Sequence, residues 1–176
     1  MDPFATLGLP RRYDVDKVAL DRRYRELQQT LHPDKHASAP APERALTLRK
    51  AIEVNEAYRV LRDDQKRAEA LLATLGGQVS EHTADPELLM EMMELREALS
   101  EARADKDAAQ VAKLSAAVAQ QAAGARNELA QVFEQLQETP EPSASALQRA
   151  QALLGRLRYY RRFQDEVAMF EDEALA

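Results

Sequence analysis

Apolar residues recur every three or four positions through most of this chain, which is the spacing of helices that bury one side. From about residue 16 to residue 31 the apolar positions are Leu20, Tyr24, Leu27 and Leu31. A second series over about 42–61 comprises Leu48, Ala51, Val54, Tyr58 and Leu61. The stretch 36–42 between them contains two prolines and small residues, so it predicts a loop. We expect these two helices to pack as an antiparallel pair.

The rest of the chain predicts one short helix and three long ones. Asp63 or Asp64 can cap a helix over 64–75, which Gly76 and Gly77 end. A linker follows, and Asp85 with Pro86 is a typical helix start. The three long helices are expected at 85–103, 106–138 and 143–172. We therefore predict an all-α protein with an N-terminal domain over 1–75, a linker over 76–84, and an antiparallel three-helix bundle over 85–176.

The helix over 85–103 has more apolar residues than one buried side requires. Leu88, Met92, Leu95 and Leu99 share one side and form the expected core stripe. Leu89, Met90 and Met93 lie on a different side, which Glu97 shares. Such a surplus indicates either a wide core stripe, to which Leu89 could belong, or an exposed apolar patch that binds a partner.

The last helix shows a similar surplus. Its expected core stripe is Leu147, Ala150, Leu154 and Leu157. Tyr159 and Phe163 are predicted to project from another side, where aromatic residues are candidate hot spots for binding.

Composition excludes several classes of protein. The chain has no cysteine, which removes disulfides, thiolate metal sites and cysteine nucleophiles. Its net charge is −6, with 14 basic and 12 acidic residues in 1–75 but 10 and 18 in 76–176, so we expect two modules with different partners and no nucleic acid. No apolar run approaches the roughly 20 residues of a membrane span, and the N-terminus lacks a signal-peptide pattern. We expect a cytoplasmic bacterial protein.

The sequence gives little support for a catalytic site or a metal site. An all-helical enzyme needs acid, base or nucleophile groups together, and the chain offers three histidines and no glycine-rich phosphate loop. His32 and His36 have a spacing that suits zinc on a helix, but Pro33 breaks that helix. We expect no metal, no cofactor and no catalytic residue. Asn55, a polar residue on an apolar stripe, is expected to be a structural amide that ties the hairpin loop to its helix.

His32, Pro33 and Asp34 lie at the turn of the predicted hairpin. Alone, this tripeptide is also an ordinary helix stop followed by an aspartate turn. Its surroundings are the opening segment DPFATLGL and the helix segment VNEAYRVL. Together these resemble a J domain, the module of DnaJ-type co-chaperones. The segments RAEALL (67–72) and LLMEMMELRE (88–97) resemble one branch of that family, the iron–sulfur co-chaperones of the HscB type, so the resemblance covers nearly the whole chain.

This resemblance implies a co-chaperone with no catalytic activity of its own. The J domain would stimulate ATP hydrolysis by an Hsp70-class chaperone similar to HscA, and the bundle would deliver an iron–sulfur scaffold protein similar to IscU. The chaperone-binding residues would be His32, Pro33 and Asp34 with the exposed strip Arg22, Arg25 and Gln29. The scaffold-binding residues would be Leu89, Met90, Met93, Glu97 and Tyr159, with Tyr159 where the family has a phenylalanine.

The roles of these residues follow from their chemistry. We expect Asp34 to pair with an arginine of the chaperone, Pro33 to keep the turn rigid, and His32 to link the turn back to the helices. For Arg22 and Arg25 a plain solvated helix face explains the pattern equally well. The alternative for the whole chain is a general J-domain co-chaperone whose bundle binds a different client.

Overall fold

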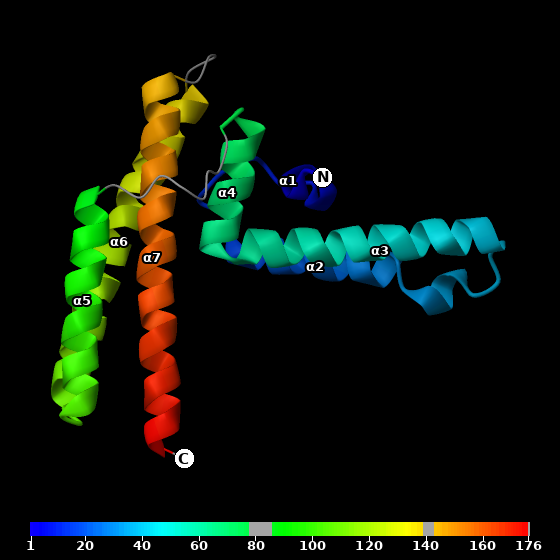
Figure 1. Ribbon diagram of the computed structural model, residues 1–176. Coiled ribbons are helices and arrows are strands. Elements are labelled where there is room, and N and C mark those ends of the chain that lie inside the picture. The colour runs from blue at the N-terminus through cyan, green and yellow to red at the C-terminus, as the bar shows by residue number, and fades with distance from the viewer. Residues whose placement is uncertain (78–85, 139–142, 176) are drawn as a thin grey trace. The chain divides into compact units, whose positions relative to one another are not determined.

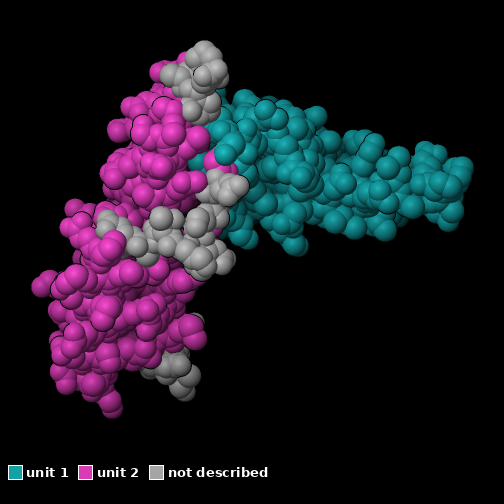
Figure 2. All heavy atoms as spheres, turned by 45° about the horizontal axis from the view of Figure 1, so that its top comes forward, with its two compact units in different colours: residues 1–76 teal, residues 77–176 magenta. Residues whose placement is uncertain are grey.

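The computed structural model describes residues 1–77, 86–138 and 143–175, with side chains described as far as residue 170 in the last helix. Contacts divide the chain into two compact units, Met1–Gly76 and Gly77–Ala176, which Figure 2 colours separately. Every regular element in the described ranges is a helix, as Figure 1 shows, so the all-α prediction is confirmed. None of these helices combines the length and apolar character that a membrane span requires.

The first unit is a helical hairpin with short flanking helices. Figure 1 shows α2 and α3 running side by side, and α1 packs against both. The elements are α1 (Pro3–Leu7), α2 (Lys17–Thr30), the 3-10 helix η1 (Pro33–His36), α3 (Ala41–Arg62) and α4 (Asp64–Thr74). The two long helices begin and end within two residues of their predicted bounds.

Aspartates begin three of these helices. Asp16 accepts hydrogen bonds from the backbone N–H groups of Val18 and Ala19, at 2.8 and 3.2 Å. Asp2 and Asp63 cap α1 and α4 in the same way. Such caps stabilise a helix by about 1 kcal/mol each, because they satisfy N–H groups that have no partner within the helix. Gly8, with φ 63°, ends α1 in the left-handed conformation that favours glycine.

The core of the first unit joins all four α-helices. Its fully buried side chains come from α1 (Phe4 and Leu7), α2 (Leu20), α3 (Ala57 and Leu61) and α4 (Ala68, Leu71 and Leu72). Burial of a large apolar side chain contributes roughly 1.5–3 kcal/mol, so this cluster fixes α2 and α3 as a rigid platform.

The prediction that Leu48 belongs to this core is wrong, since its side chain is largely exposed. The reason is a difference in length: α3 has 22 residues and α2 has 14. The first turns of α3 extend past the end of α2, as Figure 1 shows, and no core lies beneath them. The apolar stripe of α3 is therefore buried only from Val54 onward.

The second unit is built from three helices. They are α5 (Pro86–Ala104), α6 (Ala108–Glu138) and α7 (Ala144–Leu175). The main contact is between α6 and α7, and α5 packs chiefly on α6. The predicted core positions of α5 are buried at Leu88, Met92 and Leu99, whereas Leu95 is half-buried. Residues 78–84 of the predicted linker, the predicted helix start at Asp85, and residues 139–142 between the last two predicted helices lie outside the described residues.

The prediction that Phe163 projects away from the core is wrong. Phe163 is fully buried, and Tyr160 and Val167 nearby are also buried, each 3% exposed. Along α7 the buried positions follow a spacing of about three and a half residues, from Ala150 through Leu157 onward. Seven residues fall just short of two full turns, so a stripe with this spacing moves round the helix. The predicted core stripe was extended from Leu147 and Leu154 at 3.6 residues per turn. It does not follow this rotation round the helix, and it therefore places Phe163 off the core.

Candidate functional sites

The turn after α2 presents an aspartate to solvent. The Asp34 backbone N–H donates to Nδ1 of His32 at 3.3 Å, so His32 caps the short helix η1. One Asp34 carboxylate oxygen lies 3.6 Å from the same nitrogen. The Asp34 side chain is 90% exposed, and no hydrogen bond from another described residue reaches its carboxylate. Pro33 occupies the first position of η1, where its fixed φ suits a helix start. The carboxylate is therefore held on an ordered turn and is free to accept a partner's donors.

The link from this turn back to the hairpin comes from His36 rather than His32. Nε2 of His36 donates to the backbone carbonyl of Thr30, in the last turn of α2, at 3.0 Å. Because α2 leaves its last carbonyls without partners, this bond satisfies one of them. The expectation that His32 makes the link is wrong: Pro33 directs the chain into η1, and His32 is used to cap it.

The strip on α2 is exposed as expected but is not purely basic. Arg22, Arg25 and Gln29 line one open groove, which Asp21 and Glu26 share. The Arg22 guanidinium lies 4.0 Å from the Glu26 carboxylate one turn later. An exposed pair of this kind stabilises the helix by no more than a few tenths of a kcal/mol, so the arginines remain available to a partner.

A polar cluster holds α2 against α3 near the middle of the hairpin. The Tyr24 hydroxyl and the Gln28 amide both donate to Oδ1 of Asn55, each at 3.0 Å. Asn55 is thus a structural amide, but it ties α3 to α2 rather than to the loop. The Tyr24 and Tyr58 rings stack with centroids 3.9 Å apart. The Tyr58 hydroxyl donates to Asp21 at 2.7 Å, and this bond, together with burial, raises the pKa of Tyr58.

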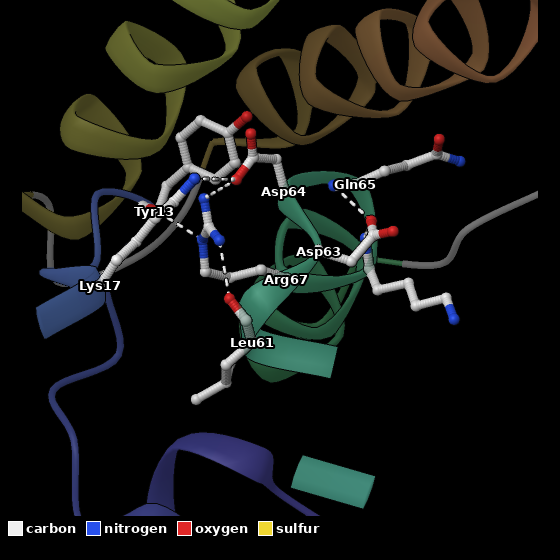
Figure 3. A network of polar contacts seen from close by, with 8 residues as sticks. Tyr13, Lys17, Leu61, Asp63, Asp64, Gln65 and Arg67 are labelled. Atoms are coloured by element: carbon white, nitrogen blue, oxygen red, sulfur yellow. Dashed lines mark hydrogen bonds and ion pairs between the residues drawn. The ribbon is translucent and has the colours of Figure 1, made fainter. Parts of the chain in front are cut away.

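A buried arginine fixes α4 and the segment before α2, as Figure 3 shows. Arg67 is only 5% exposed. Its guanidinium donates to the backbone carbonyls of Tyr13 and Leu61, both at 2.7 Å, and to Asp64 at 2.8 Å. It also lies over the Tyr13 ring, 5.3 Å from the centroid. Two of these partners are main-chain groups, so Arg67 holds the backbone in place and has a structural role rather than a role in binding a partner.

An exposed apolar patch lies on α5. Leu89, Met90 and Met93 are between 41% and 72% exposed, which confirms that they lie off the core stripe. Glu97 is exposed on the same helix. An apolar surface with an acidic edge is typical of a partner site, and methionines adapt to a partner's shape. The wide-core alternative is wrong for these three residues, including Leu89.

Tyr159 on α7 is half-buried, in contrast with its buried neighbour Tyr160. The Arg162 guanidinium lies 5.9 Å from the Tyr159 ring centroid. Seven residues after Tyr159, Glu166 of α7 forms an ion pair with Arg96 of α5, with the charged atoms 3.6 Å apart. The role of Tyr159 in binding stays a prediction.

Two family models cover most of the chain. The DnaJ domain model matches residues 2–70, which contain the His32 turn, and the model described as the HSCB C-terminal oligomerisation domain matches residues 84–168, which contain the α5 patch. The chain is 34% identical over 177 residues to the co-chaperone protein HscB homolog of Aromatoleum aromaticum, covering 99% of this chain and 93% of that protein. It is 36% identical over 180 residues to the homolog from a Vibrio cholerae strain, covering 99% of both chains.

The chain belongs to the HscB family of J-domain co-chaperones.

Solved structures of the HscB family agree with this assignment. The chaperone HscB from Vibrio cholerae has a TM-score of 0.83 and 30% identity, with 98% of this chain and 99% of that chain covered. The human co-chaperone protein HscB has a TM-score of 0.84 at 24% identity, covering 97% of this chain and 82% of that one, and so supports the fold. Membership of the HscB family implies a J-domain co-chaperone role in iron–sulfur cluster assembly.

Sequence reasoning missed three features that matter for these sites. The sequence indicates His36 only by its spacing from His32, because the bond from His36 to Thr30 depends on the helix η1, which the local sequence does not reveal. The sequence indicates Arg67 only as part of the segment RAEALL, since an arginine one turn into a helix gives no sign that it is buried. Tyr160 lies beside Tyr159 in the chain, and only the rotation of the α7 stripe separates the buried ring from the half-buried one.

Proposed function

We propose that this protein stimulates the ATPase of an Hsp70-class chaperone similar to HscA, and that it delivers an iron–sulfur scaffold protein similar to IscU to that chaperone. The chain itself carries out no chemistry, since ATP is hydrolysed on the chaperone. The observation that carries the proposal is the exposed carboxylate of Asp34 on an ordered turn at the end of the α2–α3 hairpin. The bacterial relatives support a location in the bacterial cytoplasm beside such a chaperone.

Docking is proposed to use charge at two places in the first unit. Asp34 offers a carboxylate that an arginine of the chaperone can hold with two parallel hydrogen bonds. Arg22 and Arg25 on α2 would meet acidic groups of the chaperone and speed the encounter. His32 and Pro33 act indirectly, because they order the turn before docking and so reduce the entropy lost on binding.

Scaffold binding is proposed to use the α5 patch. Leu89, Met90 and Met93 offer exposed apolar surface, which a protein partner would bury. Glu97 would pair with a cation of the scaffold at the edge of the patch, and Tyr159 would add an aromatic contact from α7. Apolar anchors of this kind are often worth about 2 kcal/mol or more each.

The decisive variants separate the two sites. Asp34→Asn keeps the size of the side chain and removes its charge, and we expect it to abolish most of the stimulation of chaperone ATPase while scaffold binding stays unchanged. The triple variant Leu89→Ala, Met93→Ala and Tyr159→Ala should lose scaffold binding while its own stimulation of chaperone ATPase stays unchanged. Far-ultraviolet circular dichroism checks that each variant is folded. Full stimulation by a folded Asp34→Asn protein at limiting concentration would contradict the docking role of the turn.

The second candidate function is a J-domain co-chaperone that delivers a different client to its chaperone. The exposed methionines of α5 are compatible with a different client, because methionine-rich surfaces bind varied partners. In that case Asp34→Asn would still lose ATPase stimulation, but the purified scaffold would neither bind the protein nor enhance the stimulation.

A further inference from the structure

A groove of about 510 Å³ lies within the second unit, between the N-terminal half of α5 and the helices α6 and α7. Binding pockets for small molecules commonly have volumes of about 300–1,000 Å³. The lining of this groove includes none of the residues proposed above for scaffold binding. Its polar residues are Glu87, Glu91, Gln121, Glu128, Arg156 and Tyr160.

Tyr160 is the unusual residue of the groove. Its side chain is only 3% exposed, and its hydroxyl makes no hydrogen bond to any residue in the described ranges. No fully buried side-chain oxygen or nitrogen among the described residues lacks a hydrogen-bond partner. The Tyr160 hydroxyl therefore opens into the groove, where it can donate one hydrogen bond and accept others. A phenol buried to this degree usually has a polar partner, so the groove holds an unused hydrogen-bonding group.

The charge of the groove is negative. Three carboxylates line it against one guanidinium, that of Arg156. Glu128 is already paired with Arg149, whose Nε lies 2.7 Å from Oε1 of the carboxylate. Glu91 accepts a hydrogen bond at 2.6 Å from the neutral amide of Gln121, and no described cation pairs with it. Burial raises the pKa of Tyr160, and the negative charge of Glu91 raises it further, against the opposing effect of Arg156. A cation placed here would thus meet a charge that the protein leaves uncompensated.

The lining of the groove suits a group that is apolar along its stem and charged at its end. Ala125 and Leu153 provide an apolar stretch of the lining beside the polar groups. Gly124 also lines the groove, and a Cβ added there would meet nothing within 4 Å. An aliphatic stem can therefore lie along the apolar part while a planar cation reaches Glu91 and the Tyr160 hydroxyl. Arginine has such a stem, and its guanidinium donates in several directions at once.

From the groove, its free phenol and its uncompensated carboxylate, we infer a binding site for an arginine side chain that a partner protein segment presents to α5, α6 and α7. The Tyr160 hydroxyl accepts one guanidinium N–H, and the Glu91 carboxylate accepts others. This site is independent of the scaffold-binding proposal, because it uses other residues and another kind of ligand group.

The test is a titration of the full-length, isotope-labelled protein with N-acetyl-L-argininamide, followed by NMR through the backbone amides. We expect saturable shifts at residues 121–125 and 156–160, and at least a tenfold weaker response to N-acetyl-L-citrullinamide, which has the same shape without the charge. Agmatine represents a free guanidino compound. We expect it to bind no more tightly than the capped arginine; saturable binding of agmatine alone would overturn the assignment to a protein segment.

Three variants check the assigned atoms. Tyr160→Phe removes only the hydroxyl, and we expect it to weaken binding at least fivefold; Glu91→Gln should weaken it more. Gly124→Leu should fill the groove and abolish binding, while Gly124→Ala serves as the matched control that leaves room for the ligand. Thermal melting shows which variants are folded. The site would be refuted by saturable binding that Tyr160→Phe and Gly124→Leu leave unchanged, or by the absence of saturable shifts at tens of millimolar probe.

Discussion

Replacing Arg67 with methionine should destabilise the first unit strongly. Methionine fills much of the same space but donates no hydrogen bond, so the backbone carbonyls of Tyr13 and Leu61 lose the bonds that Arg67 donates. A buried acceptor left without a donor costs about 1–3 kcal/mol. The bond to Leu61 is buried and carries this cost in full, the bond to Tyr13 is part-buried and carries less, and with the lost contact to the Tyr13 ring the total is roughly 2–4 kcal/mol. The pair with Asp64 adds little, because that carboxylate is 44% exposed and Lys17 lies 3.7 Å from it.

This expected loss is large against the stability of a small domain, which is about 5–15 kcal/mol. Removing a buried ion pair as a whole is often neutral, since both charges then leave the core. Here the outcome differs, because the main acceptors are backbone carbonyls that no substitution removes. Arg67→Lys keeps the charge but reaches fewer acceptors, so it should recover at most about half of the lost stability.

Native-state hydrogen exchange of the α3 amides over 54–61 measures the stability of this unit within the full chain. Arg59→Met is the matched control: it makes the same chemical change on an exposed position of α3 and should stay within about 0.5 kcal/mol of the unchanged protein. If Arg67→Met also stays within about 0.5 kcal/mol, the network drawn in Figure 3 does not stabilise the unit.

Four further outcomes are expected. In the second unit, Leu129→Ala should destabilise by about 2–5 kcal/mol, because Leu129 is fully buried, whereas exposed Met93→Ala should change the melting temperature little; equal effects in calorimetry would contradict the assigned core. Gly124→Ala should stabilise α6 by roughly 0.5–1 kcal/mol in urea unfolding, since its added methyl meets no neighbour, and a loss of stability would show hidden crowding. Burial acts to raise the pKa of Asp2, but the Arg11 guanidinium and the N–H groups of Ala5 and Phe4 outweigh it and hold the pKa below the usual 3.8. The stability that Asp2 contributes is therefore present above about pH 4 and lost as the pH falls through the lowered value, so the loss caused by Asp2→Ala in thermal melts should shrink towards acid pH; a pH-independent loss would exclude the charge as its cause. A fragment of residues 1–77 should keep its helical circular dichroism and weak stimulation of the chaperone but lose the effect of the scaffold; scaffold binding by this fragment as tight as that of the whole chain would contradict the division of labour.

The sequence alone predicts those structural features that depend on a local or repeated pattern. Helix positions followed from apolar spacing, and Asp63 was one of two candidate caps because of its place before an apolar series. The position of Met90 and Met93 off the core stripe followed from the angle between residues on a single helix, but only the structure shows that both are exposed rather than part of a wide core. The turn at Pro33 followed from the sequence, because proline ends a helix by its own covalent geometry.

Features that depend on what lies opposite a residue could not be predicted. Leu48 has the right spacing for a core position, but its burial depends on where α2 ends. Phe163 and Tyr160 are buried because the α7 stripe follows its neighbours rather than an ideal period. Asn55 was recognised as a satisfied amide, yet its partners on α2 came from the register of two helices, which a single helix pattern does not contain.

The central claim is that one protein couples a chaperone to a scaffold through two separate surfaces. The most direct measurement is single-turnover ATP hydrolysis by the HscA-like chaperone, with this protein and the IscU-like scaffold added singly and together. We predict that both together accelerate hydrolysis more than the two separate effects combined. Asp34→Asn should remove nearly all acceleration, and the α5 and α7 triple variant should remove only the part that depends on the scaffold. Simple addition of the two separate effects, unchanged by either variant, would contradict the account.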